Sequence, residues 1–143
     1  MTTITLTIDG KEVKGGQGDT ILEVCKRNGI DVPTLCHFDD LAERGLCRMC
    51  LVEAKGERGF VPACTTEARD GMEVTTENEK LTALRRANLE LLFSEKNHFC
   101  MFCEMSGDCE LQNLAYRYGM DHVRYDYSWP KLPVDATRKY FLF

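Results

Sequence analysis

The sequence has no long apolar run, no lysine-rich segment and no excess of basic residues. No apolar stretch approaches the roughly 18 residues that a membrane-spanning helix requires, so we expect no membrane span. The first ten residues, MTTITLTIDG, lack the basic and apolar regions of a secretory signal. We therefore expect a cytoplasmic protein, free or in a complex at the cytoplasmic membrane face. The formal net charge of −5 argues against a nucleic-acid partner.

A nucleotide-binding fingerprint is also missing. Gly15, Gly16 and Gly18 form a predicted loop after a strand, but they lack the G-x-G-x-x-G spacing and the helix that should follow it. Any nicotinamide or flavin cofactor is therefore expected on a partner. Apolar residues make up 43% and charged residues 29% of the 143 positions, which is ordinary for a globular chain of one domain or two small ones.

Cysteine, in contrast, is abundant, with eight residues in this short chain. Without a secretory signal, clustered cysteines favour metal binding or redox chemistry over disulfides. Seven of the eight fall into two spaced sets. The eighth, Cys25, lies in a predicted short helix, where we expect a buried, inert thiol.

The first half of the chain has the pattern of a small mixed sheet with one helix. Apolar and polar residues alternate at 3–8, as in a half-buried strand. Asp9-Gly10 predicts a hairpin turn, and residues 11–14 are the predicted second strand of the hairpin. Asp19 and Thr20 are candidate caps for a helix that Gly29 would end. Further strands are predicted at 51–54, 60–63 and 72–76. This order indicates an α+β arrangement.

The second half of the chain is helical. Residues 78–95 predict an amphipathic helix capped by Asn78, and residues 110–118 predict a second helix that stops at Gly119. The predicted apolar face of the first helix consists of Leu81, Leu84, Ala87, Leu91 and Leu92, and that of the second helix of Leu111, Leu114, Ala115 and Tyr118. The aromatic-rich tail, 121–143, has no regular period. Its rings pack either on the chain's own core or on a partner or downstream domain.

The first cysteine set, C-x(10)-C-x(2)-C-x(13)-C, consists of Cys36, Cys47, Cys50 and Cys64. Plant-type ferredoxins hold a 2Fe–2S cluster with a shorter first gap but the same order and the same central pair. Gly45, just before that pair, would allow the backbone to approach a cluster. Tetrahedral zinc also accepts CxxC pairs and remains an alternative.

The second set, C-x(2)-C-x(5)-C, provides only the three thiolates of Cys100, Cys103 and Cys109. His98 lies two residues before Cys100, and in an extended segment these two side chains point the same way. We therefore predict His98 as the fourth ligand. A Cys₃His set suits either zinc or a 4Fe–4S cluster.

Two longer stretches resemble one known family. They are PTLCHFDDLAERGLCRMCLVEAKGERGFVPACTTEARDGMEV and LRRANLELLFSEKNHFCMFCEMSGDCELQNLAYRYGM. They are similar to the N-terminal part of the iron–sulfur subunits of NADH-linked oxidoreductases. That family includes the large iron–sulfur subunit of respiratory complex I, the diaphorase small subunit of NAD-linked hydrogenases, NAD-linked formate dehydrogenases and some iron-only hydrogenases. The resemblance is greatest to the hydrogenase-diaphorase and formate-dehydrogenase branches, because only Phe99 separates His98 from Cys100.

The resemblance implies a β-grasp 2Fe–2S ferredoxin domain at 1–77, a small helical His–Cys₃ 4Fe–4S domain at 78–120 and an extended tail at 121–143. It implies one 2Fe–2S cluster on the first cysteine set and one 4Fe–4S cluster on the second set. Three of the second cluster's ligands match Cys100, Cys103 and Cys109, with His98 as the fourth.

The function implied by the resemblance is electron transfer without substrate chemistry. The chain would relay electrons between a flavin- and NAD(H)-binding diaphorase subunit and a further iron–sulfur or catalytic subunit of a hydrogenase, formate dehydrogenase or complex I-like enzyme. Relatives continue into further clusters, so the sequence corresponds either to a fragment or to a short form that docks on a partner. The alternatives are the N-terminal electron-input region of a larger catalytic chain and a zinc-stabilised interaction module.

Overall fold

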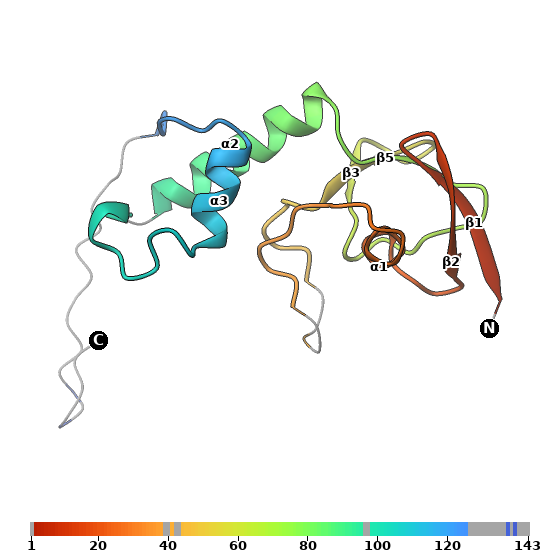
Figure 1. The fold of residues 1–143 in the computed structure, drawn as a ribbon, viewed down its shortest axis with the longest axis horizontal. Coiled ribbons are helices and arrows are strands. Elements are labelled where there is room, and N and C mark those ends of the chain that lie inside the picture. Colours follow the sequence, from red (N-terminus) through yellow and green to blue (C-terminus); the bar gives the residue numbers. More distant parts are fainter. Residues whose placement is uncertain are drawn as a thin grey trace.

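A five-stranded sheet with one short helix forms one end of the molecule, and two further helices form the other end (Figure 1). This computed structural model describes residues 2–38, 41, 44–95, 98–125, 137 and 139. The predicted α+β arrangement is confirmed. None of the helices in these described residues has both the length and the hydropathy needed to cross a bilayer.

The sheet has the strand order β2-β1-β5-β3-β4. The strands are β1 (Thr3–Ile8), β2 (Lys11–Gly16), β3 (Leu51–Ala54), β4 (Phe60–Pro62) and β5 (Glu73–Thr75). β1 and β5 are parallel, and the other neighbours are antiparallel. The hairpin turn predicted at Asp9-Gly10 is present, with positive φ at both residues.

β2 continues further than predicted. The sequence predicts a loop at Gly15 and Gly16, but these residues pair with Ile4 and Thr3 of β1, respectively. A Cβ at Gly15 would lie 2.6 Å from Cγ2 of Val24, so the missing side chain lets the following helix lie close against the strand. The glycine therefore marks a tight helix–strand contact.

That helix, α1 (Ile21–Arg27), begins at one of its two predicted caps. Thr20 Oγ1 accepts a hydrogen bond from the Glu23 N–H at 3.2 Å, and Glu23 Oε2 accepts one from the Thr20 N–H at 2.6 Å. This is a capping box. Asp19, the other candidate, instead forms an ion pair with Arg27. The buried face of α1 covers the sheet core with Ile21, Leu22, Val24 and Cys25.

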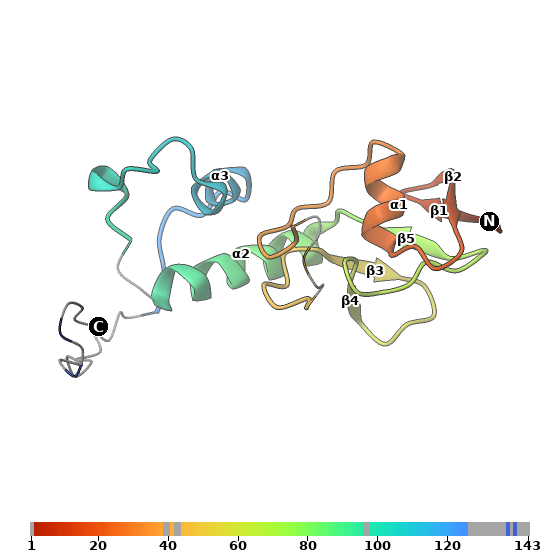
Figure 2. The ribbon, with the colours of Figure 1, turned by 90° about the horizontal axis from the view of Figure 1, so that it is seen from below.

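The long helix α2 (Glu79–Glu95) reaches from the β3 side of the sheet to the far end of the molecule (Figure 2). Asn78 caps it as predicted, since its Oδ1 accepts a hydrogen bond from the Leu81 N–H at 2.9 Å. The predicted apolar face is partly wrong. Leu91 is 53% exposed, whereas Arg85 is fully buried. The buried positions are Leu81, Arg85, Leu89 and Glu90.

The short helix α3 (Glu110–Arg117) packs against α2, and a single turn, η1 (Cys100–Phe102), precedes it. Leu114, Ala115 and Tyr118 are buried as predicted. Leu89, Leu114 and Tyr118 form a second core together with Met49, which comes from the cysteine loop of the sheet domain. The two ends of the molecule therefore share a packed core.

The prediction for the aromatic tail falls almost entirely outside the described residues. Tyr125 is described and is 47% exposed. The other rings singled out from the sequence are outside that range, namely Tyr127, Trp129, Tyr140, Phe141 and Phe143.

Candidate metal centres

The first cysteine set forms two pairs. Cys36, Cys47 and Cys50 lie on the segment between α1 and β3, and Cys64 follows β4. The sulfurs of Cys50 and Cys64 are 3.3 Å apart and buried. The sulfur of Cys36 accepts a hydrogen bond from the Cys47 N–H at 3.4 Å. Two pairs of thiols suit a centre with two irons, because each iron of such a cluster takes two protein ligands.

Backbone N–H groups act on these sulfurs. The Cys47 N–H donates to the sulfur of Cys36 at 3.4 Å, and the N–H groups of Leu46 and Met49 favour negative charge on Cys36 and Cys47, respectively. Burial alone would raise the pKa of Cys36, but these N–H donors outweigh it and lower that pKa. Burial raises the pKa of Cys47, with the Met49 N–H opposing the effect. The N–H donors of the loop thus stabilise negative charge on the sulfur of Cys36.

The conformation that aims these donors requires left-handed backbone at two positions. Gly45 has a φ of +57° and is buried, and Arg48 has a φ of +56°. Glycine adopts this conformation without penalty, but arginine seldom does. The role predicted for Gly45 matches its backbone: it allows the chain to turn just before the Leu46 and Cys47 donors.

The second set surrounds a cavity of about 310 Å³. All four predicted ligands, His98, Cys100, Cys103 and Cys109, line this cavity, together with Phe93 of α2 and Leu111 of α3. The His98 ring lies against Phe93 with the ring centroids 4.9 Å apart. Cys109 is the N-cap residue of α3, where the helix terminus carries partial positive charge.

The two donor sets are arranged in ways that iron–sulfur clusters accept. The first set forms two pairs, which suits two irons, and the second set lines one cavity, which suits a larger cluster.

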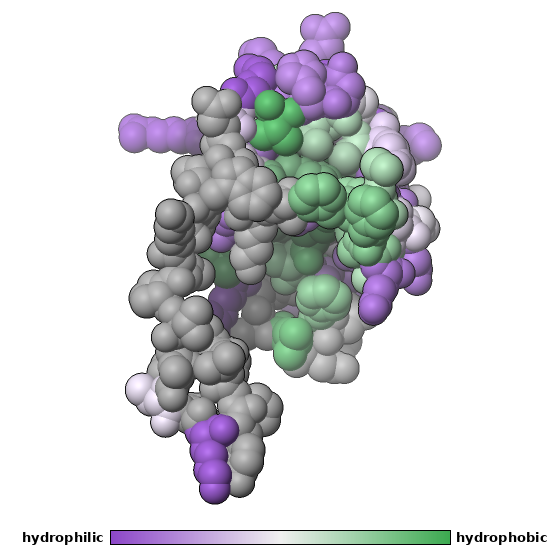
Figure 3. Space-filling model, turned by 90° about the vertical axis from the view of Figure 1, so that its left-hand side faces the viewer, coloured by the Kyte–Doolittle hydropathy of each residue, from purple (hydrophilic) through white to green (hydrophobic). Residues whose placement is uncertain are grey.

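Exposed apolar side chains lie beside the second set. Met101 is 87% and Phe102 81% exposed, and Phe99 and Met105 are also exposed. Figure 3 shows apolar side chains gathered on the face at this end of the molecule. Phe38, Leu41 and Leu46 are likewise exposed on the first cysteine loop. No sequence pattern marked these residues in advance.

Arg85 is the main site residue that the sequence analysis missed. Its guanidinium is fully buried and donates to three carbonyls, to a Glu77 carboxylate oxygen at 2.7 Å and to the Tyr118 hydroxyl at 3.2 Å. The three carbonyls belong to Met49 (3.1 Å), Leu51 (2.7 Å) and Thr76 (2.9 Å). Its position between Leu81 and Leu89, at four-residue spacing, was the available signal.

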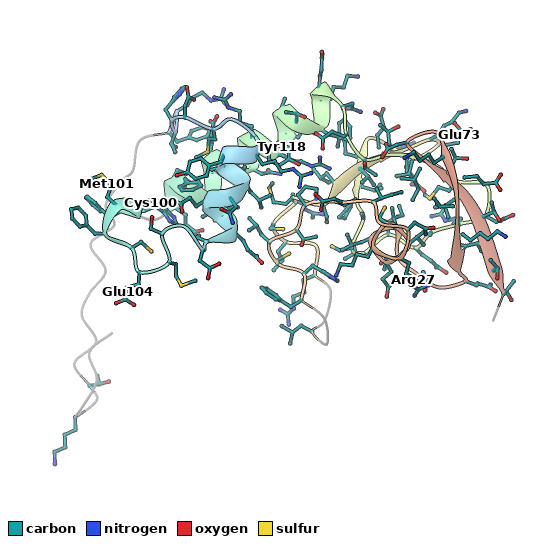
Figure 4. The ribbon with its side chains drawn as sticks, in the orientation of Figure 1. Arg27, Glu73, Cys100, Met101, Glu104 and Tyr118 are labelled. Carbon is teal, nitrogen blue, oxygen red and sulfur yellow. The ribbon has the colours of Figure 1, made fainter. Side chains whose placement is uncertain are left out.

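The labelled residues of Figure 4 lie along the long axis of the molecule. Figure 4 shows Cys100, Met101 and Glu104 at one end of the molecule, Arg27 and Glu73 on the sheet domain at the other, and Tyr118 between them.

Cys25 belongs to neither set. It is fully buried in the sheet core, as predicted, and burial raises its pKa to about 11, which agrees with the expectation of an inert thiol.

Known proteins match both parts of the chain. The family described as "2Fe-2S iron-sulfur cluster binding domain" matches residues 1–79, and "NADH-ubiquinone oxidoreductase-G iron-sulfur binding region" matches residues 85–124. The NAD-reducing hydrogenase HoxS subunit gamma of Cupriavidus necator is 39% identical over 140 residues, which cover 97% of this chain and 59% of that protein. The NADP-reducing hydrogenase subunit HndD of Solidesulfovibrio fructosivorans is 41% identical over 131 residues, covering 88% of this chain and 22% of that protein.

A solved structure has the same fold. The crystal structure of an NAD⁺-reducing [NiFe]-hydrogenase in the H₂-reduced state matches with a TM-score of 0.85 and 40% identity, covering 95% of this chain and 57% of that one. The chain therefore spans between about one fifth and three fifths of the length of these relatives.

Proposed function

The chain belongs to the family of 2Fe–2S iron–sulfur cluster binding domains, and from this premise we propose that it relays electrons inside a multi-subunit NAD(P)-linked oxidoreductase. Its two regions correspond to one 2Fe–2S and one 4Fe–4S cluster. Each cluster, when bound, accepts and releases an electron. The role of the chain is to hold the clusters, to orient donors toward their sulfurs and to limit water around them.

The ligand assignment is part of this proposal. Cys36 and Cys47 would bind one iron of the 2Fe–2S cluster, and Cys50 and Cys64 the other. His98, Cys100, Cys103 and Cys109 would each bind one iron of the 4Fe–4S cluster. The observation that carries the proposal is that all four members of the second set line one cavity, while the first set forms two pairs.

The partners follow from the same reasoning. We assign the flavin and NAD(H) to a diaphorase subunit and the electron acceptor or donor to a hydrogenase- or formate dehydrogenase-type subunit. The exposed apolar residues at the second set suit contact with such subunits, because a free surface rarely keeps Met101 and Phe102 this exposed. We keep the domain limits 1–77, 78–120 and 121–143 and a cytoplasmic location as parts of the proposal.

A second candidate is the electron-input region of a larger catalytic chain. The similarity to a hydrogenase subunit of which this chain spans only 22% favours it. The two candidates place the same clusters in different polypeptides. The complete reading frame, or the mass of the native polypeptide, distinguishes them.

The ligand assignment is tested by cluster content and electron paramagnetic resonance (EPR). The anaerobically purified protein should be brown and contain about six iron and six sulfide ions per chain, two of each from the small cluster and four from the large one. His98→Ala should alter the EPR signal and potential of the 4Fe–4S cluster only, and His98→Cys should keep that cluster at a lower potential. Cys25→Ala is the matched control and should change neither cluster. A colourless protein with two zinc ions would overturn the proposal, and unchanged His98→Ala spectra would remove His98 from the ligand set.

A further inference from the structure

We propose that Arg85 and Asn88 of α2 are positioning residues for the 2Fe–2S centre, which set the orientation of the CxxC loop and thereby raise the reduction potential of the cluster. The inference rests on the proposed function, because it takes Cys47 and Cys50 as ligands. It makes the potential of the first cluster depend on a helix that belongs to the second cluster's domain.

The contacts join α2 to three carbonyls around the CxxC motif. Arg85 donates from Nε to the Met49 carbonyl at 3.1 Å and from Nη2 to the Leu51 carbonyl at 2.7 Å. Asn88, one turn further along the helix, donates from Nδ2 to the Arg48 carbonyl at 3.2 Å. All three acceptors therefore face α2.

The N–H groups of the same peptides lie on the side away from α2. In a trans peptide the N–H group points away from the C=O group. With the carbonyls of Arg48 and Met49 turned toward α2, the N–H groups of Met49 and Cys50 point away from that helix. The Met49 N–H acts on the Cys47 sulfur as a donor, since it opposes the rise in the pKa of that thiol that burial causes. Hydrogen bonds to cluster sulfurs stabilise the more negative, reduced state, so this orientation raises the potential.

The loop needs this external support because its backbone is strained. Arg48 has a φ of +56°, which costs a residue with a side chain free energy and persists only where the surroundings hold it. The Asn88 bond acts on the carbonyl of this residue. The Met49 side chain, fully buried in the core beside Leu89 and Tyr118, holds the next position.

Two effects of Arg85 could act on the potential, namely its charge and its hydrogen bonds. The charge is partly balanced by the Glu77 carboxylate at 2.7 Å, which reduces its field at the cluster. The Glu77 carboxylate does not cancel the effect of the hydrogen bonds, which act through the orientation of the loop. We therefore expect orientation to dominate, so that Arg85→Lys, which keeps the charge but cannot reproduce the forked set of bonds, lowers the potential.

The experiment is an EPR-monitored redox titration of the intact protein, in its native complex where it forms one. Four forms are compared, namely wild type, Arg85→Lys, Asn88→Ala and Arg86→Met. Arg86 is the matched control, because it lies on the same helix but is 37% exposed and pairs with Asp121 outside the loop. Asn88→Ala is the milder change and decides the question if Arg85→Lys does not fold.

Arg85→Lys and Asn88→Ala should each reduce the ratio of reduced to oxidised 2Fe–2S cluster at a fixed ambient potential. We expect about a tenfold fall for Arg85→Lys, which corresponds to about 59 mV for a one-electron couple, and a smaller fall for Asn88→Ala. The 4Fe–4S potential should be the same in all four forms, and Arg86→Met should match wild type.

Unchanged 2Fe–2S potential and g-values in Asn88→Ala, or an equal shift in Arg86→Met, would overturn the inference. A wild-type protein without any 2Fe–2S signal would instead overturn the proposed function. The two failures are therefore distinguishable in one set of titrations.

Discussion

Replacing Gly45 by alanine should release the 2Fe–2S cluster selectively. Gly45 has a φ of +57°, and its backbone leads into the Leu46 and Cys47 N–H groups that donate to Cys36. Alanine destabilises this conformation by roughly 1–2 kcal/mol. Its Cβ would also lie 3.3 Å from Cγ2 of Thr65, a tight contact that the exposed Thr65 side chain relieves by rotating. The strain therefore falls mainly on the donor peptides.

Gly119→Ala is the matched control for this prediction. Gly119 has nearly the same φ, +59°, but a Cβ there would meet no atom within 4 Å, and the residue follows α3 instead of the first cysteine loop. Both variants should lower the melting temperature by roughly 3–8 °C. Only Gly45→Ala should speed the loss of the 2Fe–2S signal.

The assay follows visible circular dichroism and iron release at a fixed temperature under anaerobic conditions. We expect Gly45→Ala to lose the 2Fe–2S signal several-fold faster than Gly119→Ala, and Gly45→Asn to fall between Gly45→Ala and wild type, because asparagine tolerates left-handed backbone better. Equal rates for the two alanine variants would refute the role given to this turn.

Two further predictions concern buried residues. Cys25 should resist iodoacetamide in the folded protein at pH 8. Burial raises its pKa from 9.0 to about 11, so the stability that the neutral thiol contributes is complete below pH 9 and is lost between pH 9 and 11. In Cys25→Ala the unfolding free energy should therefore change less with pH over this range. Labelling of native Cys25 would contradict its burial. Leu89→Ala should cost about 2–5 kcal/mol of unfolding free energy, because Leu89 is fully buried in the second core. Leu91→Ala, on the exposed side of α2, should change the unfolding free energy by less than about 0.5 kcal/mol. Denaturant unfolding measures both values, and a larger loss in Leu91→Ala than in Leu89→Ala would contradict the prediction.

Local chemistry made much of the molecule predictable. The Asp9-Gly10 turn, the caps at Thr20 and Asn78 and the grouping of the cysteines depend on neighbouring residues, so each leaves a short sequence pattern. The sets that line the cavity and form the two pairs are those that spacing had indicated.

Features that depend on distant segments were not predictable in this way. The extension of β2 through Gly15 depends on the approach of Val24, and the direction of the buried face of α2 depends on what lies against it. The usual burial preferences of the residue types place leucines in the core and arginine on the surface. Arg85 is an exception because its guanidinium finds hydrogen-bond acceptors inside the protein. These are three backbone carbonyls, the Glu77 carboxylate and the Tyr118 hydroxyl.

The sequence by itself determined the candidate donor sets, because cysteine and histidine are the usual ligands of iron–sulfur clusters and their spacing is visible in the chain. Only the tertiary structure decided how the two domains are joined. Met49 enters the core of the helical domain, and Arg85 enters the backbone of the 2Fe–2S loop. Contacts between residues more than 30 positions apart leave no periodic pattern, since their free energy depends on geometry that exists only after folding.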